Sequence, residues 1–273
     1  MAVEIAAKDV MALRNKTGLS MMECKRALEE SGGDPEKAED LLRKKMKGKM
    51  DTRTDRAAGE GRVAVKVADD GRSAVIVEIR AETDFTAKNE KFGVMVDRVA
   101  TLALAASAGD VTPTPEMLKP VDEIRISTGE NASIARIHKI EGGGDSMFGS
   151  YVHHDGKTAV LLHCTGSVSQ ETAKQVCMHI AAAMPRPQGV TRDDIPAHVI
   201  DKERRLAMDL AMESGKNEEI AKKIVDGKIN ALVADLALIE QPFVMDPAKK
   251  IKDVLGANGS ASAFLRWQVG ETA

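Results

Sequence analysis

The middle of the chain carries a group of histidine and cysteine residues, the side chains best suited to chemistry near neutral pH. The group consists of His153, His154, His163, Cys164, Cys177 and His179. Such residues could bind zinc, which needs four converging ligands, or could pair a thiol nucleophile with a histidine base. Because successive side chains of a strand point to opposite faces, His153 and His154 cannot line one site. The same geometry separates His163 from Cys164, so the spacing supports neither chemistry.

Other sequence motifs for catalysis are also missing. The chain has no GxxxxGK[ST] phosphate loop, no HExxH zinc motif and no EF-hand calcium loop. Cys24, Cys164 and Cys177 are most simply small buried apolar residues. We therefore expect neither an enzyme with covalent chemistry of its own nor a bound metal or other cofactor.

Composition and charge restrict the class of protein further. The chain has 273 residues, 43% of them hydrophobic, and a net charge of −3 with both signs mixed along the sequence. This length supports two or three structural units, and the charge offers no field that would attract nucleic acid or anionic lipid. Three cysteines without a CxxC pair are typical of a reducing compartment. Because the chain shows neither a signal peptide nor an apolar run of about 18 residues, we expect a cytoplasmic protein that binds no membrane and, directly, no nucleic acid.

Residues 1–46 carry the start and stop signals of three short helices. Gly18 is suited to end the first helix, and Ser20 with Glu23 forms a capping box at the start of the second. Asp34-Pro35 is a typical beginning for the third. Three helices of this size predict a compact bundle like the ubiquitin-associated type, which is usually a recognition module. The following residues, 47–61, are polar and without periodicity, as in a linker.

The remainder of the chain contains an internal repeat. Residues 70–77, Asp-Gly-Arg-Ser-Ala-Val-Ile-Val, align with residues 155–162, Asp-Gly-Lys-Thr-Ala-Val-Leu-Leu. Each copy predicts a strand, an Asp-Gly turn and a second strand, followed by a helix. Third strands are expected over 132–140 and 263–269. The predicted fold class is therefore α+β, with two related subdomains of antiparallel sheet and helix: 62–140, and 141–194 with 240–273.

Residues 195–239 show helical rather than strand-like spacing of apolar residues, and they predict an antiparallel helical hairpin inserted into the second subdomain. In its first half, Leu206 and Leu210 share one helical face with Val199 and Glu203. In its second half, apolar residues recur at near-heptad spacing: Ile220, Ile224, Ile229, Leu232, Leu236 and Ile239. We expect these stripes to pack on each other, and a second copy of the chain is a candidate partner for them.

A polar turn lies between a buried strand and a helix in the first subdomain. Residues 73–79 are aliphatic and β-branched, and an apolar stripe of helical spacing begins at Phe92. Thr83-Asp84-Phe85 stands between them. One interpretation is that Phe85 packs on the first turn of the following helix as a hydrophobic staple.

A resemblance to a known family gives a second interpretation. The run from Glu82 to Phe92, Glu-Thr-Asp-Phe-Thr-Ala-Lys-Asn-Glu-Lys-Phe, resembles the signature of bacterial translation elongation factor Ts. Parts of the first bundle and the run Gln-Pro-Phe-Val-Met-Asp-Pro at 241–247 are also similar. The resemblance implies a guanine-nucleotide exchange factor for the GTPase elongation factor Tu, in its GDP-bound and nucleotide-free forms. It implies that the turn enters the GTPase and dislocates Mg²⁺ through Thr83, Asp84, Phe85 and Thr86, although Thr86 stands where the family usually has valine.

The resemblance also implies further partner-binding residues: Met21, Lys25, Thr128, Gly129, His179, Val244 and Met245. Each has a plainer interpretation as well. Lys25 could be a solvated helix charge, Thr128-Gly129 a simple turn, and Met245 part of the core. His179 could be a half-buried histidine with an ordinary partner. The alternative for the whole chain is a non-catalytic module that binds protein or RNA through its ubiquitin-associated-like bundle.

Overall fold

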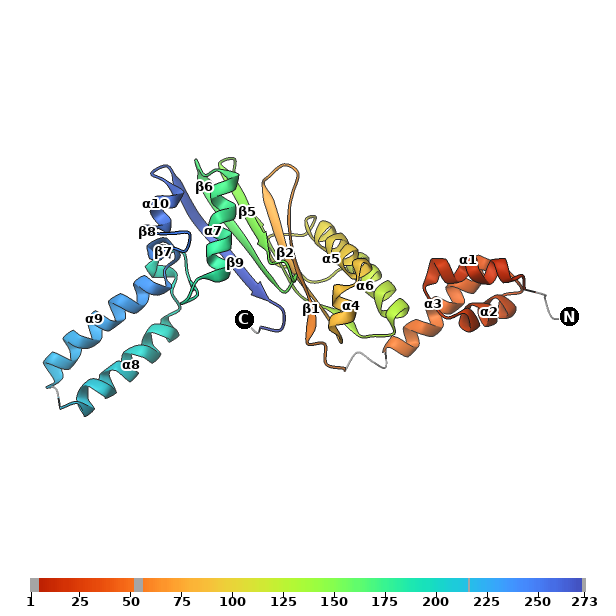
Figure 1. Ribbon diagram of the computed structural model, residues 1–273, viewed down its shortest axis with the longest axis horizontal. Coiled ribbons are helices and arrows are strands. Elements are labelled where there is room, and N and C mark those ends of the chain that lie inside the picture. Colours follow the sequence, from red (N-terminus) through yellow and green to blue (C-terminus); the bar gives the residue numbers. More distant parts are fainter. Residues whose placement is uncertain (1–4, 52–55, 216, 272–273) are drawn as a thin grey trace. The chain divides into compact units, whose positions relative to one another are not determined.

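The computed structural model describes residues 5–51, 56–215 and 217–271 (Figure 1). Part of the linker expected over 47–61, and the last two residues of the subdomain expected to end at 273, lie outside the described residues. The chain forms two compact units. The first contains Met1–Lys66, Val77–Lys139 and Gln268–Ala273, and the second contains Val67–Ile76 and Ile140–Trp267.

Helices α1 (Ala7–Thr17), α2 (Met21–Glu30) and α3 (Pro35–Asp51) form the predicted N-terminal bundle. Gly18 ends α1 with φ of 73°, a conformation that glycine adopts without strain, and its N–H donates to the carbonyl of Arg14. The capping box at Ser20 and Glu23 is present. The core of the bundle consists of Val10, Leu13, Leu19, Cys24, Ala27, Leu28, Ala38, Leu42 and Met46. Helix α3 continues to Asp51, so the first residues of the expected linker are helical.

The first sheet has the strand order β1-β2-β4-β3. Its strands are β1 (Glu60–Val67), β2 (Ser73–Ala81), β3 (Gly109–Asp110) and β4 (Ala132–Glu141). Strand β2 is buried along most of its length, as its aliphatic composition predicts. Gly61 permits the neighbouring strand to approach closely, because a Cβ atom there would lie 2.2 Å from the carbonyl oxygen of Ile79.

Helices α4 (Asp84–Lys88), α5 (Glu90–Ala103) and α6 (Pro115–Thr128) belong to the same subdomain. Helix α5 buries the predicted stripe that begins at Phe92. Helix α6 was not among the elements predicted from the sequence, although Pro115 at its first turn and Gly129 at its C-cap are typical helix signals. Pro120 lies inside α6 and weakens the helical pattern, because proline disfavours helix interiors.

The second unit repeats the strand–turn–strand–helix pattern. Its sheet has the order β5-β6-β9, from β5 (Ser146–Val152), β6 (Thr158–Gly166) and β9 (Gly259–Gln268). Helix α7 (Gln170–Ala182) packs on β5, where a Cβ atom on Gly149 would lie 2.8 Å from that of Ala173. The remaining elements are η1 (Arg192–Asp194), η2 (Leu238–Glu240), β7 (Pro242–Phe243), β8 (Asp246–Lys250) and α10 (Ile251–Leu255). The predicted α+β fold class is confirmed.

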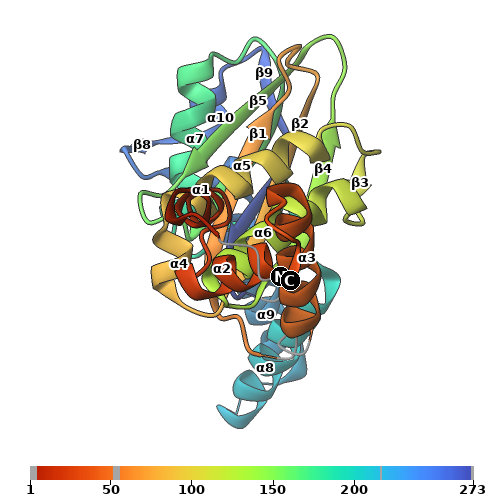
Figure 2. The same cartoon turned by 90° about the vertical axis from the view of Figure 1, so that its right-hand side faces the viewer.

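Helices α8 (Ala197–Glu213) and α9 (Glu218–Leu236) lie side by side as the predicted hairpin (Figures 1 and 2). The prediction of its packing face was wrong in part. Leu206 and Leu210 are about half exposed, and the buried seam on α8 uses Ala207 and Ala211 instead. One residue along a helix is a rotation of about 100°, so the seam lies on a different face from the predicted stripe. Small alanines at the contact allow the two helices to approach closely.

On α9, the seam consists of Ala221, Val225, Ile229, Val233 and Leu236. The prediction was correct for Ile229 and Leu236, whereas Ile220 and Ile224 are exposed. Within the residues that the structure describes, no helix combines the length and apolar character needed to cross a membrane.

Candidate functional site

The Thr83–Thr86 segment forms the start of the short helix α4 rather than an open turn. Thr83 is the N-cap, and its hydroxyl oxygen accepts a hydrogen bond from the N–H of Thr86 at 3.3 Å. Asp84 occupies the first helical turn and is paired with Lys88, with 2.7 Å between Oδ2 and Nζ. The transition from strand β2, which ends at Ala81, to helix α4, which begins at Asp84, occurs where the sequence predicts it.

Phe85 is 83% exposed. This exposure excludes the hydrophobic-staple interpretation, which requires the ring to pack on the following helix. The two residues after it, Thr86 and Ala87, are buried. Helix α4 is therefore anchored through one face while it presents an aromatic ring on another. A largely exposed phenylalanine is unusual, because burying such a side chain typically contributes about 1.5–3 kcal/mol.

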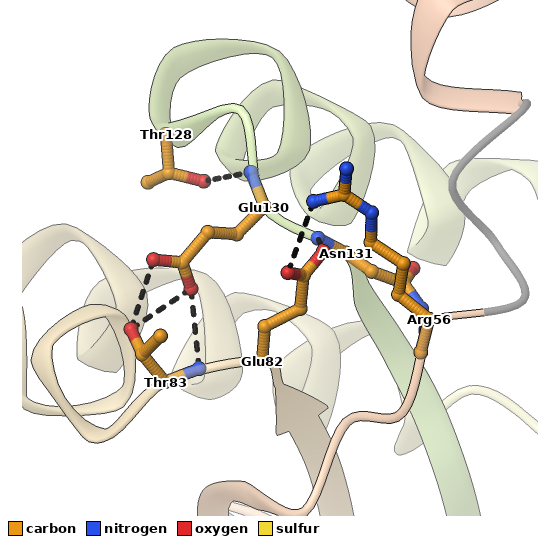
Figure 3. A network of polar contacts seen from close by, with 6 residues as sticks. All are labelled: Arg56, Glu82, Thr83, Thr128, Glu130 and Asn131. Carbon is orange, nitrogen blue, oxygen red and sulfur yellow. Dashed lines mark hydrogen bonds and ion pairs between the residues drawn. The ribbon is translucent and has the colours of Figure 1, made fainter.

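Glu130 holds the beginning of α4 from the loop that follows α6 (Figure 3). The hydroxyl of Thr83 donates to Oε1 and Oε2 of Glu130 at 2.8 and 3.0 Å, and the N–H of Thr83 donates to Oε2 at 3.2 Å. The N–H of Glu130 in turn donates to the hydroxyl of Thr128 at 3.3 Å. Thr83 and Thr128, which the sequence predicted as separate contacts, are thus connected through one residue: the carboxylate of Glu130 accepts from Thr83, and its N–H donates to Thr128.

Glu82 makes a second connection to the same loop (Figure 3). Its Oε1 accepts from the N–H of Asn131 at 2.6 Å, and its Oε2 lies 3.4 Å from the guanidinium of Arg56. The side-chain amide of Asn131 closes the group by donating to the carbonyl of Arg56 at 2.9 Å. Two consecutive residues, Glu82 and Thr83, therefore attach the strand end and the helix start to one loop.

Arg62 on β1 holds the opposite end of α4. Its Nε donates to the carbonyl of Ala87 at 2.6 Å, and its Nη2 donates to the carbonyl of Lys88 at 3.4 Å. A positive charge is favourable there, because the last carbonyls of a helix carry partial negative charge. Sequence reasoning missed Arg62, Glu130 and Asn131, since their pairing with α4 and with Glu82 spans tens of residues.

A cavity of about 140 Å³ lies beside Thr86. It is lined by Gly18, Thr86, Asn89, Lys91, Phe92, Ile124, Ser127 and Thr128. Thr86 therefore stands at the border between the anchored face of α4 and open space. Directly after the lining residue Thr128, Gly129 is the left-handed C-cap of α6, so Thr128-Gly129 is a helix end rather than a free turn.

Met21 and Lys25 lie on α2 of the N-terminal bundle. Met21 is 40% exposed, and the side chain of Lys25 is exposed beside Glu29, at 3.8 Å between the charged atoms. An exposed ion pair of this kind contributes little to stability, so Lys25 remains available to a partner.

His179, Val244 and Met245 lie together in the second unit. The His179 ring is buried, and its Nδ1 accepts a hydrogen bond from the N–H of Val244 at 3.3 Å. Its Nε2 therefore carries the proton and donates to Oε1 of Gln241 at 2.9 Å. Burial lowers the pKa of His179, although the hydrogen bond with Gln241 opposes this. The ring supports the exposed Val244–Met245 pair from beneath and is not itself presented to solvent.

The prediction that His153 and His154 point to opposite faces of a strand was wrong, because β5 ends at Val152 and the two rings lie edge to face with 4.3 Å between their centres. Cys164, Cys177 and His163 are held within the second unit. Burial raises the pKa of the Cys164 thiol to about 11, and burial raises the pKa of Cys177 further. Both thiols are therefore protonated at neutral pH. His163 stacks on Phe148 with 4.8 Å between the ring centres. Across the described parts of the chain, no three His, Cys, Asp or Glu side chains are grouped so that they could hold a metal ion.

Comparisons with known proteins point in one direction. The family model described as elongation factor TS matches residues 82–271. Among curated relatives, elongation factor Ts of Sodalis glossinidius is 40% identical, with 98% of this chain and 92% of the relative covered. Elongation factor Ts of Hahella chejuensis is 41% identical and that of Thioalkalivibrio sulfidiphilus 39%, each over 98% of this chain and 92% of the relative.

Proposed function

The chain belongs to the elongation factor Ts family, and from this premise we propose that it promotes the release of GDP from the translational GTPase elongation factor Tu. It acts by binding, as a nucleotide exchange factor in the cytoplasm, without covalent chemistry of its own. Its partner is the GTPase in both the GDP-bound and the nucleotide-free form.

The exposed ring of Phe85 on a firmly held helix carries this proposal. Helix α4 is attached at its start through Glu130 and at its end through Arg62. A ring on such a support can be pushed into a partner without the support giving way. Because the attachment already exists in the free protein, little conformational entropy is lost when the ring inserts.

Insertion of Phe85 would release GDP through the Mg²⁺ ion of the GTPase. Mg²⁺ requires nearly ideal octahedral geometry with ligands at about 2.0–2.1 Å. A ring inserted between elements of the GTPase would shift those ligands by a large fraction of that distance, and the ion would dissociate. The carboxylate of Asp84, one residue before Phe85, would add negative charge beside the disturbed ligands.

Two further groups of residues would hold the partner while this happens. Met21 and Lys25 offer an apolar side chain and a positive charge on α2. Val244 and Met245 offer an apolar pair in the second unit. Nucleotide and exchange factor would then oppose each other's binding, and thermodynamic linkage requires the effect to be equal in both directions.

The hairpin is the proposed contact for a second copy of the chain. Leu206, Leu210, Ile220 and Ile224 leave apolar surface exposed on both of its helices. Apolar side chains that recur along a helix pair are typical of an interface, which supports self-association through residues 195–239.

The proposal is tested by stopped-flow release of a fluorescent GDP analogue from elongation factor Tu. We expect the wild-type chain to accelerate release strongly, and the Phe85→Ala variant at saturating concentration to lose about tenfold or more of that acceleration. Leu118→Ala, which truncates another exposed apolar side chain of the first unit, 43% exposed on α6, is the control and should behave like the wild type. If the folded wild-type chain leaves release unchanged, the proposed function is wrong. If the wild-type chain accelerates release and Phe85→Ala accelerates it equally, the exchange function is supported and the insertion mechanism is wrong.

A further inference from the structure

The side chain of Gln241 joins three segments of the second unit. Its carboxamide nitrogen donates to the carbonyl of Pro185 at 2.9 Å and to the carbonyl of Asp235, near the end of α9, at 2.6 Å. Its carboxamide oxygen accepts from His179 at 2.9 Å. Gln241 is only 4% exposed, so losing any of these bonds would leave a buried polar group without its partner.

Two of the attached segments present apolar side chains to solvent. Met184, directly before Pro185, is 84% exposed. On the other side, the N–H of Val244 donates to His179, and Val244 and Met245 are 44% and 51% exposed. The Pro185 carbonyl and the Val244 N–H are connected by two side chains, because Gln241 bonds the first, His179 bonds the second, and the two side chains bond each other. The two exposed segments are therefore fixed to the same small polar group.

The chemistry of these side chains suits an apolar protein surface. Methionine is flexible and polarizable, and it adapts to irregular apolar partners. A methionine exposed to the extent of Met184 contributes nothing to the core, yet the loop that carries it is held by a hydrogen bond from the buried Gln241. An exposed, adaptable side chain on a loop whose backbone is held in place is expected of a residue that contacts a partner protein.

We propose that Met184 joins Val244 and Met245 in one contact surface for the GTPase, and that Gln241 is the positioning residue that holds both loops in place. This inference rests on the proposed exchange function. It adds Met184 as a contact residue, and it gives the buried Gln241 and His179 a common role beneath the surface. The occupant is the GTPase rather than a second copy, because Val244 and Met245 already belong to the proposed GTPase contact.

The test measures the concentration of this protein that gives half-maximal acceleration of GDP release, together with the maximal rate. Met184→Ser is expected to raise the half-maximal concentration about fivefold, and Gln241→Met about tenfold, while the maximal rate stays unchanged. The rate is unaffected because Phe85 lies elsewhere in the chain. Controls are Met11→Ser, an exposed methionine of α1, and Gln175→Met, a glutamine of α7 bonded to Glu171 near the surface.

A mutant cycle, in which Gln241→Met is compared in the wild-type chain and in a triple variant, separates positioning from general stabilisation. In a background with Met184→Ser, Val244→Ser and Met245→Ser, the Gln241→Met change should raise the half-maximal concentration less than about twofold, because the side chains it positions are gone. A full effect in that background, or no effect of Met184→Ser alone, overturns the inference.

Sedimentation analysis adds one further outcome: if Met184→Ser dissociates a dimer while exchange is unchanged, the surface serves self-association and the inference is wrong. If the wild type fails to accelerate release, the exchange function itself fails, and the GTPase assignment fails with it.

Discussion

The hydroxyl of Thr83 both donates and accepts, and these two bonds define the geometry beneath Phe85. It accepts from the N–H of Thr86 and donates to the carboxylate of Glu130. The first bond begins helix α4, and the second attaches that helix to the end of α6. Side chains that make both kinds of bond fix a helix start more firmly than capping alone.

Glu130→Gln tests this support without removing side-chain volume. The two oxygens of Glu130 accept from both the hydroxyl and the N–H of Thr83, whereas glutamine has one oxygen and presents an amide to the other donor. We expect a loss of about 1–2 kcal/mol in unfolding free energy and a maximal GDP-release rate lower by about threefold to tenfold. Urea unfolding and stopped-flow release measure the two effects. Glu123→Gln, on the exposed side of α6, should change neither; an unaltered rate for Glu130→Gln would show that the carboxylate does not support the ring.

At the scale of elements, the hairpin shows how side-chain size selects a packing face. Helix α8 places alanines against α9 and leaves larger leucines exposed. Larger apolar residues would bury more area, but they would also separate the helices. The close seam at Ala207 is therefore sensitive to added volume.

Ala207→Leu and Leu206→Ala form a matched pair of adjacent substitutions in α8. Adding three carbons at the buried Ala207 should cost about 1–3 kcal/mol, because a close-packed seam cannot accommodate them. At a concentration at which the chain is monomeric, removing three carbons at the exposed Leu206 should change stability by no more than about 0.5 kcal/mol. Hydrogen exchange of the amides in α8 and α9 reports the local stability of the hairpin. A larger loss for Leu206→Ala would show that the hairpin packs in solution through the stripe predicted from the sequence.

On the largest scale, one buried carboxylate connects segments of the first unit that are far apart in the sequence. Glu78 on β2 is fully buried and accepts from Arg80 at 2.8 Å, from Arg136 on β4 at 2.7 Å and from the N–H of Gly270 at 3.0 Å. Burial alone would raise the pKa of Glu78, but the hydrogen bonds from Gly270 and the two arginines outweigh it and hold the pKa below its ordinary value. Gly270, 192 positions away in the sequence, is thereby attached to the first sheet.

This attachment predicts a pH dependence of stability. Because the pKa of Glu78 is lower in the folded than in the unfolded state, the unfolded state binds the extra proton. The stabilisation is therefore complete above the unfolded value of about 4.5 and is lost as the pH falls through the folded value. Glu78→Gln should lower the unfolding free energy at pH 7 by about 3 kcal/mol, since it leaves two arginines without their anion, and should flatten the acid limb of the stability curve. Thermal unfolding from pH 7 to pH 3 measures this, with the exposed Glu116→Gln as control. If the stability of Glu78→Gln falls as steeply with decreasing pH as that of the wild type, other carboxylates cause the pH dependence.

Features that depend on neighbours within a few residues could be predicted from the amino-acid sequence. Capping signals such as Ser20 with Glu23, the aliphatic strands of the internal repeat, and the stripe that begins at Phe92 specify which elements form and in what order. The α+β class follows from that order, and the family resemblance depends on the same short runs. Helix α6 was missed because Pro120 interrupts an otherwise adequate local signal.

The burial of side chains and the pairing of residues far apart in the sequence became known only from the folded structure. The sequence leaves Phe85 open between a packed staple and an exposed ring, because the answer depends on how α4 is attached through Arg62 and Glu130. It also cannot pair Thr83 with Glu130 across 47 positions. On α8, the choice between adjacent helical faces depends on how closely α9 approaches. Local signals specify backbone conformation, whereas burial and partner choice depend on the packing of segments that are distant in sequence.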